Sequence, residues 1–135
     1  MVVCRKLNLQ LNVYNLQASV EHKIDAANKI LGRLATEVAI LLRGKNLPTY
    51  NPSEINNIRV SVYNTDKLAV TGKKMGQKLY RHHTGFHGGL KEEKLSDRMT
   101  RDSRLVLQAA VRGMLPKNRS RARFMKNLKL FRKEL

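Results

Sequence analysis

Three histidines and three glycines share one short segment, where they could serve metal binding, catalysis or contact with RNA. The segment reads His82-His83-Thr84-Gly85-Phe86-His87-Gly88-Gly89-Leu90-Lys91. Zinc sites use three or four protein ligands, but no carboxylate or cysteine lies within this motif, and the flanking bases would oppose a cation. Imidazole and phenyl rings can instead stack on bases, while glycines let the backbone approach phosphate. We therefore expect contact with RNA. A tight turn with surface histidines is the structural alternative, and a histidine-dependent nuclease is a weaker one.

Lysine and arginine greatly outnumber the acids, mostly in the second half of the chain. The 27 Lys and Arg oppose 10 Asp and Glu, so the net charge is +17. Residues 72–135 hold 18 of the bases and 5 of the acids, a net charge of +13. Such an excess of one sign repels itself in a folded chain and favours a polyanionic partner. Nucleic acid is the expected partner because neutralised phosphates release counterions. An anionic membrane surface is the weaker alternative.

The most basic run spans residues 117–133 and contains no acid. Its bases are Lys117, Arg119, Arg121, Arg123, Lys126, Lys129, Arg132 and Lys133. A solvated charged helix face normally carries both signs, so this run predicts phosphate contact. A second group of lysines (Lys73, Lys74 and Lys78) lacks the spacing and hydroxyl of a phosphate-binding nucleotide loop, and we expect it to contact phosphates only.

Other chemistries lack the residues that they need. Cys4 is the only cysteine, which excludes an internal disulfide and a cysteine zinc cluster. No run approaches the ~18–20 apolar residues of a membrane span, and Asn8 and Gln10 interrupt any secretory signal. The sequence suggests no nucleophile–base set and no carboxylate pair in an apolar setting. We expect no enzymatic activity, cofactor, metal or membrane association.

Periodic patterns in the first half predict an α/β unit. An apolar stripe predicts a helix over residues 29–44, with Asn28 as its N-cap and Gly44 as its stop. We predict strands at 23–26, 58–63 and 68–70, because these segments are apolar or alternate with a period of two. The order strand, helix, strand favours a parallel sheet. Residues 7–13 also alternate, which fits a half-buried strand and a poorly ordered extension equally well.

The second half reads as mainly helical. We predict helices at 92–101 and 103–113, the latter ended by Gly113 and Pro116. If residues 117–133 are helical, Phe124, Leu128 and Phe131 form an apolar seam with the bases along other faces.

Four motifs in this order resemble the ribosomal protein L13 family of the bacterial large subunit. They are Leu31-Gly32-Arg33-Leu34-Ala35-Thr36 followed by Arg43-Gly44-Lys45; Asn64-Thr65-Asp66-Lys67-Leu68-Ala69-Val70-Thr71-Gly72; the His82–Lys91 segment; and Val111-Arg112-Gly113-Met114-Leu115-Pro116-Lys117-Asn118. The resemblance runs from about Lys23 to Phe131. It implies a three-layer α/β/α fold around a small, mostly parallel sheet, with basic loop and helical C-terminal extensions.

The resemblance also implies a function and partners. The chain is expected to be a structural constituent of the large ribosomal subunit that binds its rRNA, supports assembly and translation, and touches neighbouring ribosomal proteins. We expect one copy per ribosome, no homo-oligomer, and a cytoplasmic bacterial ribosome in preference to an organellar one. An RNA chaperone or regulatory RNA binder outside the ribosome is the alternative.

Charge and resemblance together predict one set of RNA-binding residues. The set is Arg33, Arg43, Lys45, Lys73, Lys74, Lys78, Arg81, His82, His83, Thr84, Gly85, His87, Gly88, Gly89, Lys91, Arg112, Met114, Lys117, Asn118, Arg119, Arg121, Arg123, Lys126 and Lys129.

Several positions depart from the family pattern. Glu21, His22 and Lys23 replace a usual Trp-Tyr pair, Ser53 replaces a frequent His, and Ser120 to Ala122 replace a Leu-Gly-Arg. The chain also ends at Leu135, before a usual His-containing tail. We therefore expect residues 1–22 to be a divergent extension and residues 23–135 to form a single ribosomal-protein domain with a basic C-terminal half.

Overall fold

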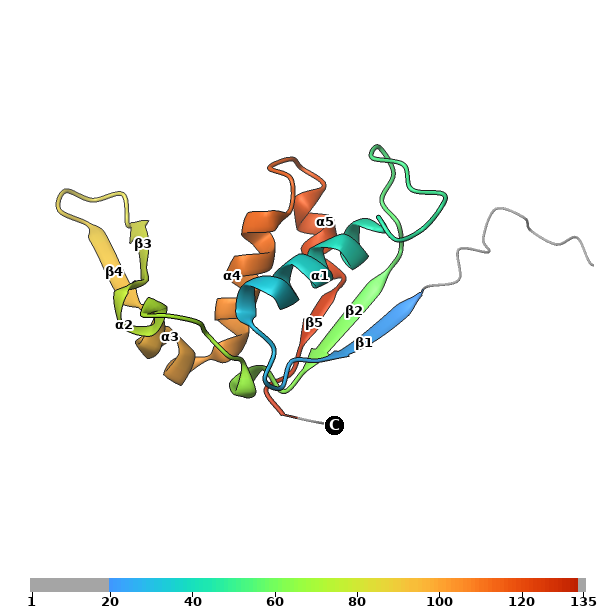
Figure 1. Cartoon of the computed structure of the whole chain (residues 1–135). Coiled ribbons are helices and arrows are strands. Elements are labelled where there is room, and N and C mark those ends of the chain that lie inside the picture. The colour runs from blue at the N-terminus through green and yellow to red at the C-terminus, as the bar shows by residue number, and fades with distance from the viewer. Residues whose placement is uncertain (1–19, 134–135) are drawn as a thin grey trace, which may run out of the picture.

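The computed structural model describes residues 20–133, which contain both strands and helices. In chain order the elements are β1 (Glu21–Asp25), α1 (Leu31–Arg43), β2 (Arg59–Tyr63), the 3-10 helix η2 (Thr65–Lys67), α2 (Lys74–Gln77), β3 (Leu79–His83), β4 (Leu90–Lys94), α3 (Leu95–Arg101), α4 (Ser103–Met114), α5 (Arg121–Lys126) and β5 (Leu128–Leu130). Figure 1 shows a body that contains β1, β2 and β5 with α1, α4 and α5, and an arm of β3 and β4 that extends to one side.

The sheet of the body has the strand order β1-β2-β5 and is parallel throughout. Val60 and Val62 of β2 are fully buried, and Ile24 of β1 lies beside Val62 on the same face. Leu128 and Leu130 of β5 flank the two valines from the other side. Parallel neighbours need a crossover, which α1 supplies between β1 and β2. The predicted α/β fold around a small, mostly parallel sheet is confirmed.

Helices α1 and α4 cover the apolar face of this sheet. The stripe of α1 is buried as predicted, through Leu34, Ala35, Val38, Ala39 and Leu42. Helix α4 adds Leu107 and Val111 to the same cluster, and Phe124 of α5 joins it. One apolar core therefore holds the sheet and these helices together. The 3.6-residue period of the α1 stripe places its apolar side chains on the single helix face that packs into this core.

One predicted end of α1 is confirmed and the other is wrong. Gly44 adopts φ 69°, and a Cβ there would collide with the side chain of Asn56, so glycine ends the helix. Asn28 is not the N-cap, because its own φ is 58° and the cap position is Ile30, which has no side-chain cap bond. The amide of Asn28 instead donates to the carbonyl of Lys67 at 3.0 Å, so the turn before the helix is tied to η2.

The strand predicted at 68–70 is wrong. In the described residues only a single bridge, between Ile30 and Ala69, forms there. Leu68 is 8% exposed and packs in the core, which explains its apolar character without a strand.

The helix predicted at 92–101 is wrong over its first three residues. These belong to β4, and α3 begins at Leu95. Strand β4 pairs with β3 in antiparallel register, so hydrogen bonds across the hairpin take the place of a first helical turn. The following helix, predicted at 103–113, is confirmed as α4 at Ser103–Met114, but Gly113 lies within it and the helix ends at Met114, before Pro116.

Of the helix considered for residues 117–133, only Arg121–Lys126 (α5) forms, and the predicted seam is wrong beyond Asn127. Leu128 and Leu130 alternate with Lys129 in β5, so they pair with β2 in place of continuing the helix. Phe131 then stacks on Tyr63 with ring centroids 5.0 Å apart. The apolar residues of this segment fit both a helical spacing of three or four residues and a strand period of two. Pairing with the edge of the sheet favours the strand.

A buried polar network fastens the start of α4 to the end of the sheet. Thr65 and Ser103 are fully buried, and their hydroxyl oxygens lie 2.8 Å apart. The hydroxyl of Ser103 donates to Asp66 Oδ1 at 2.5 Å, and Arg132 Nε donates to the same carboxylate at 3.2 Å. The Ser103 hydroxyl, and then Arg132, hold the pKa of Asp66 below its usual value. The Asn-Thr-Asp motif therefore has a structural role.

Candidate nucleic-acid interface

The predicted His-Thr-Gly segment forms the tip of the arm. The Thr84 amide donates to the Gly89 carbonyl at 3.0 Å, and the Gly89 amide donates to the Phe86 carbonyl at 2.9 Å. Gly85 and Gly88 have φ values of 91° and 69°, which favour glycine. A Cβ at Gly89 would collide with the Thr84 hydroxyl. The glycines thus shape the turn, and Phe86 is left 78% exposed at its end.

The histidines of the arm do not converge on a common point. His82 and His83 are neighbours in β3, so their side chains point to opposite faces of the hairpin. His83 Nδ1 accepts a hydrogen bond from the Gly85 amide at 3.0 Å. Among residues 20–133, no group of three His, Cys, Asp or Glu side chains could hold a metal ion. His82 and His87 are exposed and can meet an external partner.

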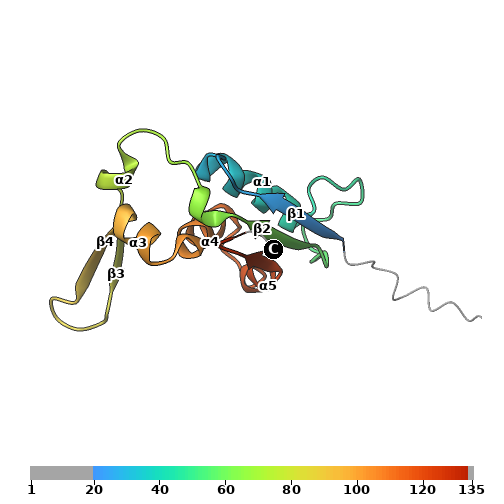
Figure 2. The same ribbon diagram turned by 90° about the horizontal axis from the view of Figure 1, so that it is seen from below.

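Tyr80 connects the base of the arm to α3. The guanidinium carbon of Arg98 lies 4.4 Å from its ring centroid, and Lys78 Nζ lies 5.6 Å from it. Both distances are within the range of cation–π attraction. Burial raises the pKa of the Tyr80 phenol. Figure 2 shows α2 and α3 at this base, with the arm projecting away from the body.

Four arginines are already neutralised by acids. The pairs are Arg81 Nε–Glu92 Oε1 at 2.6 Å, Arg101 Nη2–Glu93 Oε1 at 3.1 Å, Arg104 Nη2–Asp102 Oδ2 at 2.9 Å and Arg132 Nε–Asp66 Oδ1 at 3.2 Å. Arg81 belongs to the predicted RNA-binding set, yet its charge is matched on the neighbouring strand. The arm is therefore less cationic than its sequence indicates.

A groove between α4 and α5 gathers arginines that have no such partner. Its polar lining consists of Arg98, Arg112, Arg119, Arg121, Gln108 and Asn118. Its apolar lining consists of Leu105, Ala109, Ala122 and Met125. The volume is about 820 Å³. We call this site the α4–α5 groove.

The α4–α5 groove unites four of the predicted residues and adds one arginine that sequence reasoning missed. Arg112, Asn118, Arg119 and Arg121 were predicted, whereas Arg98 was not. Arg98 lies in a segment of mixed charge, so no run of basic residues indicated that it could contact RNA. The fold brings it to the groove because α3 and α4 pack against each other directly after the arm.

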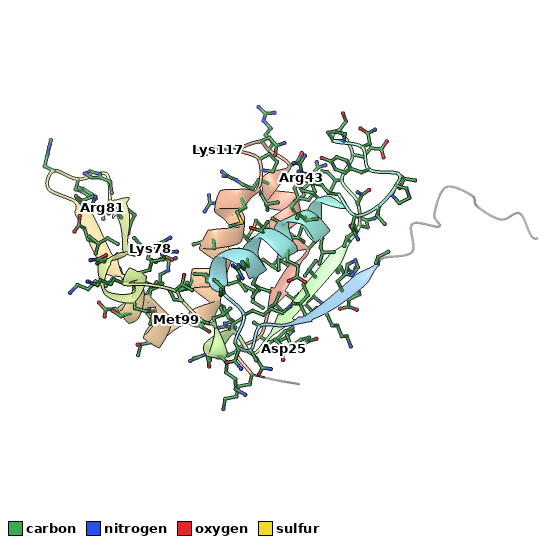
Figure 3. All side chains as sticks on the ribbon, in the orientation of Figure 1. Asp25, Arg43, Lys78, Arg81, Met99 and Lys117 are labelled. Carbon is green, nitrogen blue, oxygen red and sulfur yellow. The ribbon has the colours of Figure 1, made fainter. Side chains whose placement is uncertain are left out.

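A second basic depression lies at the C-terminal end of α1. Thr36, Arg43, Lys45 and Met114 line it, with a volume of about 400 Å³. The Thr36 hydroxyl donates to Met114 Sδ at 3.4 Å, and Arg43 donates to the Tyr50 hydroxyl at 2.7 Å. Figure 3 shows Arg43 and Lys117 at the same end of the body, and Lys78 and Arg81 on the arm.

The remaining predicted residues are dispersed. Arg33 lines a separate depression beside Glu37, and Lys129 lies exposed on the sheet next to Ser61. Arg123 and Lys126 are exposed on α5. The predicted set therefore does not form one continuous patch. It divides between the arm with α2, the α4–α5 groove, the end of α1 and these isolated positions.

These features define a class of protein. Within residues 20–133, no helix has the length and apolarity that crossing a membrane requires. The basic grooves and the exposed aromatic arm are suited to a polyanion that offers both phosphates and rings. The class is that of basic α/β nucleic-acid-binding proteins.

Comparison with known proteins identifies the family. The sequence model of the family described as Ribosomal protein L13 matches residues 19–134, and the chain belongs to this family. Relatives named "Large ribosomal subunit protein uL13" include that of Clostridioides difficile, 48% identical over 84% of this chain and 82% of its own length. Those of Caldanaerobacter subterraneus and Synechocystis are 45% and 46% identical, over 85% and 84% of this chain and 82% and 77% of their own lengths.

Proposed function

We propose that this chain is a structural constituent of the large ribosomal subunit and binds its rRNA. Its relatives bear the name of a large-subunit protein, and their family agrees with the expectation that the chain is not an enzyme. The α4–α5 groove is the observation that carries the RNA-binding part, because no acid lines it and its four arginines make no ion pair within residues 20–133. Guanidinium groups match phosphate oxygens in geometry and charge.

The predicted residues take different roles in this proposal. Arginines and lysines of the groove, of the α1 end and of α2 contact phosphates, which fix position without reading sequence. At the tip of the arm, Phe86, His82 and His87 stack on unpaired bases. The chain supports subunit assembly and translation, adjoins other ribosomal proteins, and is present once per subunit. Residues 23–135 form one domain, which also includes Glu21 and His22 because both belong to β1; the predicted extension is thereby shortened to the residues before β1.

Sedimentation of large subunits tests the placement. Tagged chain expressed in a bacterium should remain with the large subunit through a high-salt wash, at close to one copy per subunit. A chain released into the supernatant, or found mainly with free RNA, would contradict the proposal and would favour an RNA binder outside the ribosome.

Salt dependence tests the contact chemistry. If ~6 phosphates are neutralised, affinity for an rRNA fragment should fall ~10³-fold between 50 and 200 mM salt. Replacing the groove residues Arg112, Arg119 and Arg121 with alanine should weaken binding and flatten the slope of log K against log salt by about 2 to 3. The matched control replaces three exposed bases outside the basic sites, namely Lys23, Arg59 and Lys67. Equal losses in both triple variants would argue against a localised interface.

A further inference from the structure

The α4–α5 groove combines two surfaces that phosphate neutralisation alone does not require. Four arginines, which we call its rim, line the groove together with the apolar side chains of Leu105, Ala109 and Met125. A site for phosphates only needs cations that water can reach. Apolar side chains beside the cations provide, in addition, a contact surface for an aromatic ring.

The charges of the groove are available to a ligand. In residues 20–133 the ion-paired arginines lie outside the groove, and none of the four groove arginines has a carboxylate partner. The Nε of Arg98 is buried and has no hydrogen-bond partner there. The guanidinium of Arg98 is also held against the Tyr80 ring, so its position is fixed before a ligand arrives.

Two amides add hydrogen-bonding capacity of a different kind. Gln108 lies exposed at the groove and makes no side-chain hydrogen bond within the described residues. Asn118 uses Oδ1 to accept from the Arg121 amide at 3.1 Å, which leaves its Nδ2 to donate. Carboxamides can satisfy both donors and acceptors on a base edge.

The size of the groove selects among forms of RNA. A volume of about 820 Å³ lies within the ~300–1,000 Å³ that is typical of sites for small ligands. A double helix presents a convex phosphate surface and keeps its bases stacked inside, so only its backbone could touch the rim. A nucleotide outside a helix can place its base in the groove and its phosphates on the rim.

We propose that the α4–α5 groove binds one unpaired, unstacked nucleotide of RNA. The base lies on the apolar lining, Gln108 and Asn118 meet its edge, and Arg119 and Arg121 hold the adjoining phosphates. This inference rests on the proposed RNA-binding function and makes it more specific. The groove is then a base pocket within a surface that otherwise contacts only backbone.

Matched RNA probes test the inference with the full chain. Fluorescence anisotropy compares a single-stranded octaadenylate, an octamer of abasic ribose-phosphate with the same charge, and a duplex of the same length. Stacking of one base contributes ~1–3 kcal/mol, which corresponds to a ~5–150-fold change in affinity. The octaadenylate should therefore bind at least ~5-fold more tightly than the abasic octamer.

Two variants separate the base from the phosphates. Ala122→Leu fills the groove from an exposed position of α5 and leaves every charge in place, so it should remove the preference for octaadenylate without changing the salt slope. Arg119→Ala should weaken both single-stranded probes alike. Arg59→Ala is the control, since it deletes an exposed arginine of the sheet. Unchanged circular dichroism establishes that each variant is folded.

Several results would overturn the base pocket. They are equal binding of octaadenylate and the abasic octamer, tighter binding of the duplex, retention of the base preference in Ala122→Leu, or displacement of octaadenylate by an equal concentration of octaglutamate. In each case, persistence of salt-dependent rRNA binding would leave the proposed function intact. Loss of all RNA binding by the unmodified chain would refute the proposed function itself.

Discussion

Replacing Ser103 with alanine tests how the body holds α4, and the structure gives the magnitude. The change removes the hydroxyl that donates to Asp66 Oδ1 at 2.5 Å and adjoins Thr65 Oγ1 at 2.8 Å. A hydrogen bond to a charged group contributes ~1.5–3 kcal/mol. The Asp66 side chain is 37% exposed and can recover water, while Thr65 still donates to the Phe131 carbonyl. We therefore expect the lower end, a loss of about 1.5–2 kcal/mol in the free energy of unfolding.

Urea denaturation followed by circular dichroism measures this loss, and pH tests its cause. The pKa of Asp66 is lowered in the folded chain, first by the Ser103 hydroxyl. Its stabilising contribution is therefore fully present above the unfolded value, near 3.8, and is lost as pH falls through the lower folded pKa. The difference in the free energy of unfolding between the original chain and Ser103→Ala should have its full size at pH 7 and should decrease below pH 3.8.

The control is Ser53→Ala, which lies in an exposed loop and should change stability by less than about 0.5 kcal/mol. A Ser103→Ala loss below this value at pH 7 would refute the network. A loss of the same size at pH 7 and well below pH 3.8 would show that the hydroxyl acts through packing and not through the Asp66 carboxylate.

Three further predictions concern the arm and the core. Gly89→Ala should disturb the turn by collision with Thr84, so hydrogen exchange at the Thr84 amide should accelerate while the melting temperature of the body changes little; unchanged exchange would contradict this. Leu34→Ala, in the buried stripe of α1, should lower the free energy of unfolding by about 2–5 kcal/mol. A calorimetric loss of less than about 1 kcal/mol would show that Leu34 does not pack in the core as described. Phe131→Ala should remove the stack on Tyr63 and lower the free energy of unfolding, measured by urea denaturation, by about 1–2 kcal/mol. A loss below about 0.5 kcal/mol would show that the stack does not stabilise the fold.

The spacing of apolar residues predicted the elements of the body wherever it fitted either a helix or a strand, but not both. The stripe of α1 allowed a helix alone, and the alternating residues of β2 allowed a strand alone. Residues 124–131 fitted both periods, so only the neighbouring Val60 and Val62 decide that β5 is a strand. The same holds for β4, whose charged residues Lys91 to Lys94 have no strand propensity of their own and form a strand because β3 lies beside them.

Composition predicted a strongly basic surface but not which of its charges lack an acidic partner. Arg81 and Arg119 look alike in the sequence, since each lies in a basic stretch. The fold places Glu92 2.6 Å from Arg81 and no acid at the groove beside Arg119. Arg98 was missed for the converse reason, because Asp97 adjoins it in the chain yet the groove that it lines contains no carboxylate.

The placement of the few acids explains how so cationic a chain can fold and still present free charge. Glu92 and Glu93 reduce repulsion in the thin arm, which has no core of its own, and Asp66 and Asp102 do the same where α4 and the segment after β5 meet η2. These are the places where self-repulsion would separate elements joined by few apolar contacts. Beyond the Arg104–Asp102 pair at the start of α4, helices α4 and α5 are anchored in the core by Val111 and Phe124. The arginines that face the groove between them therefore remain without an acidic partner in residues 20–133, and this groove is where the charge of the chain is least balanced.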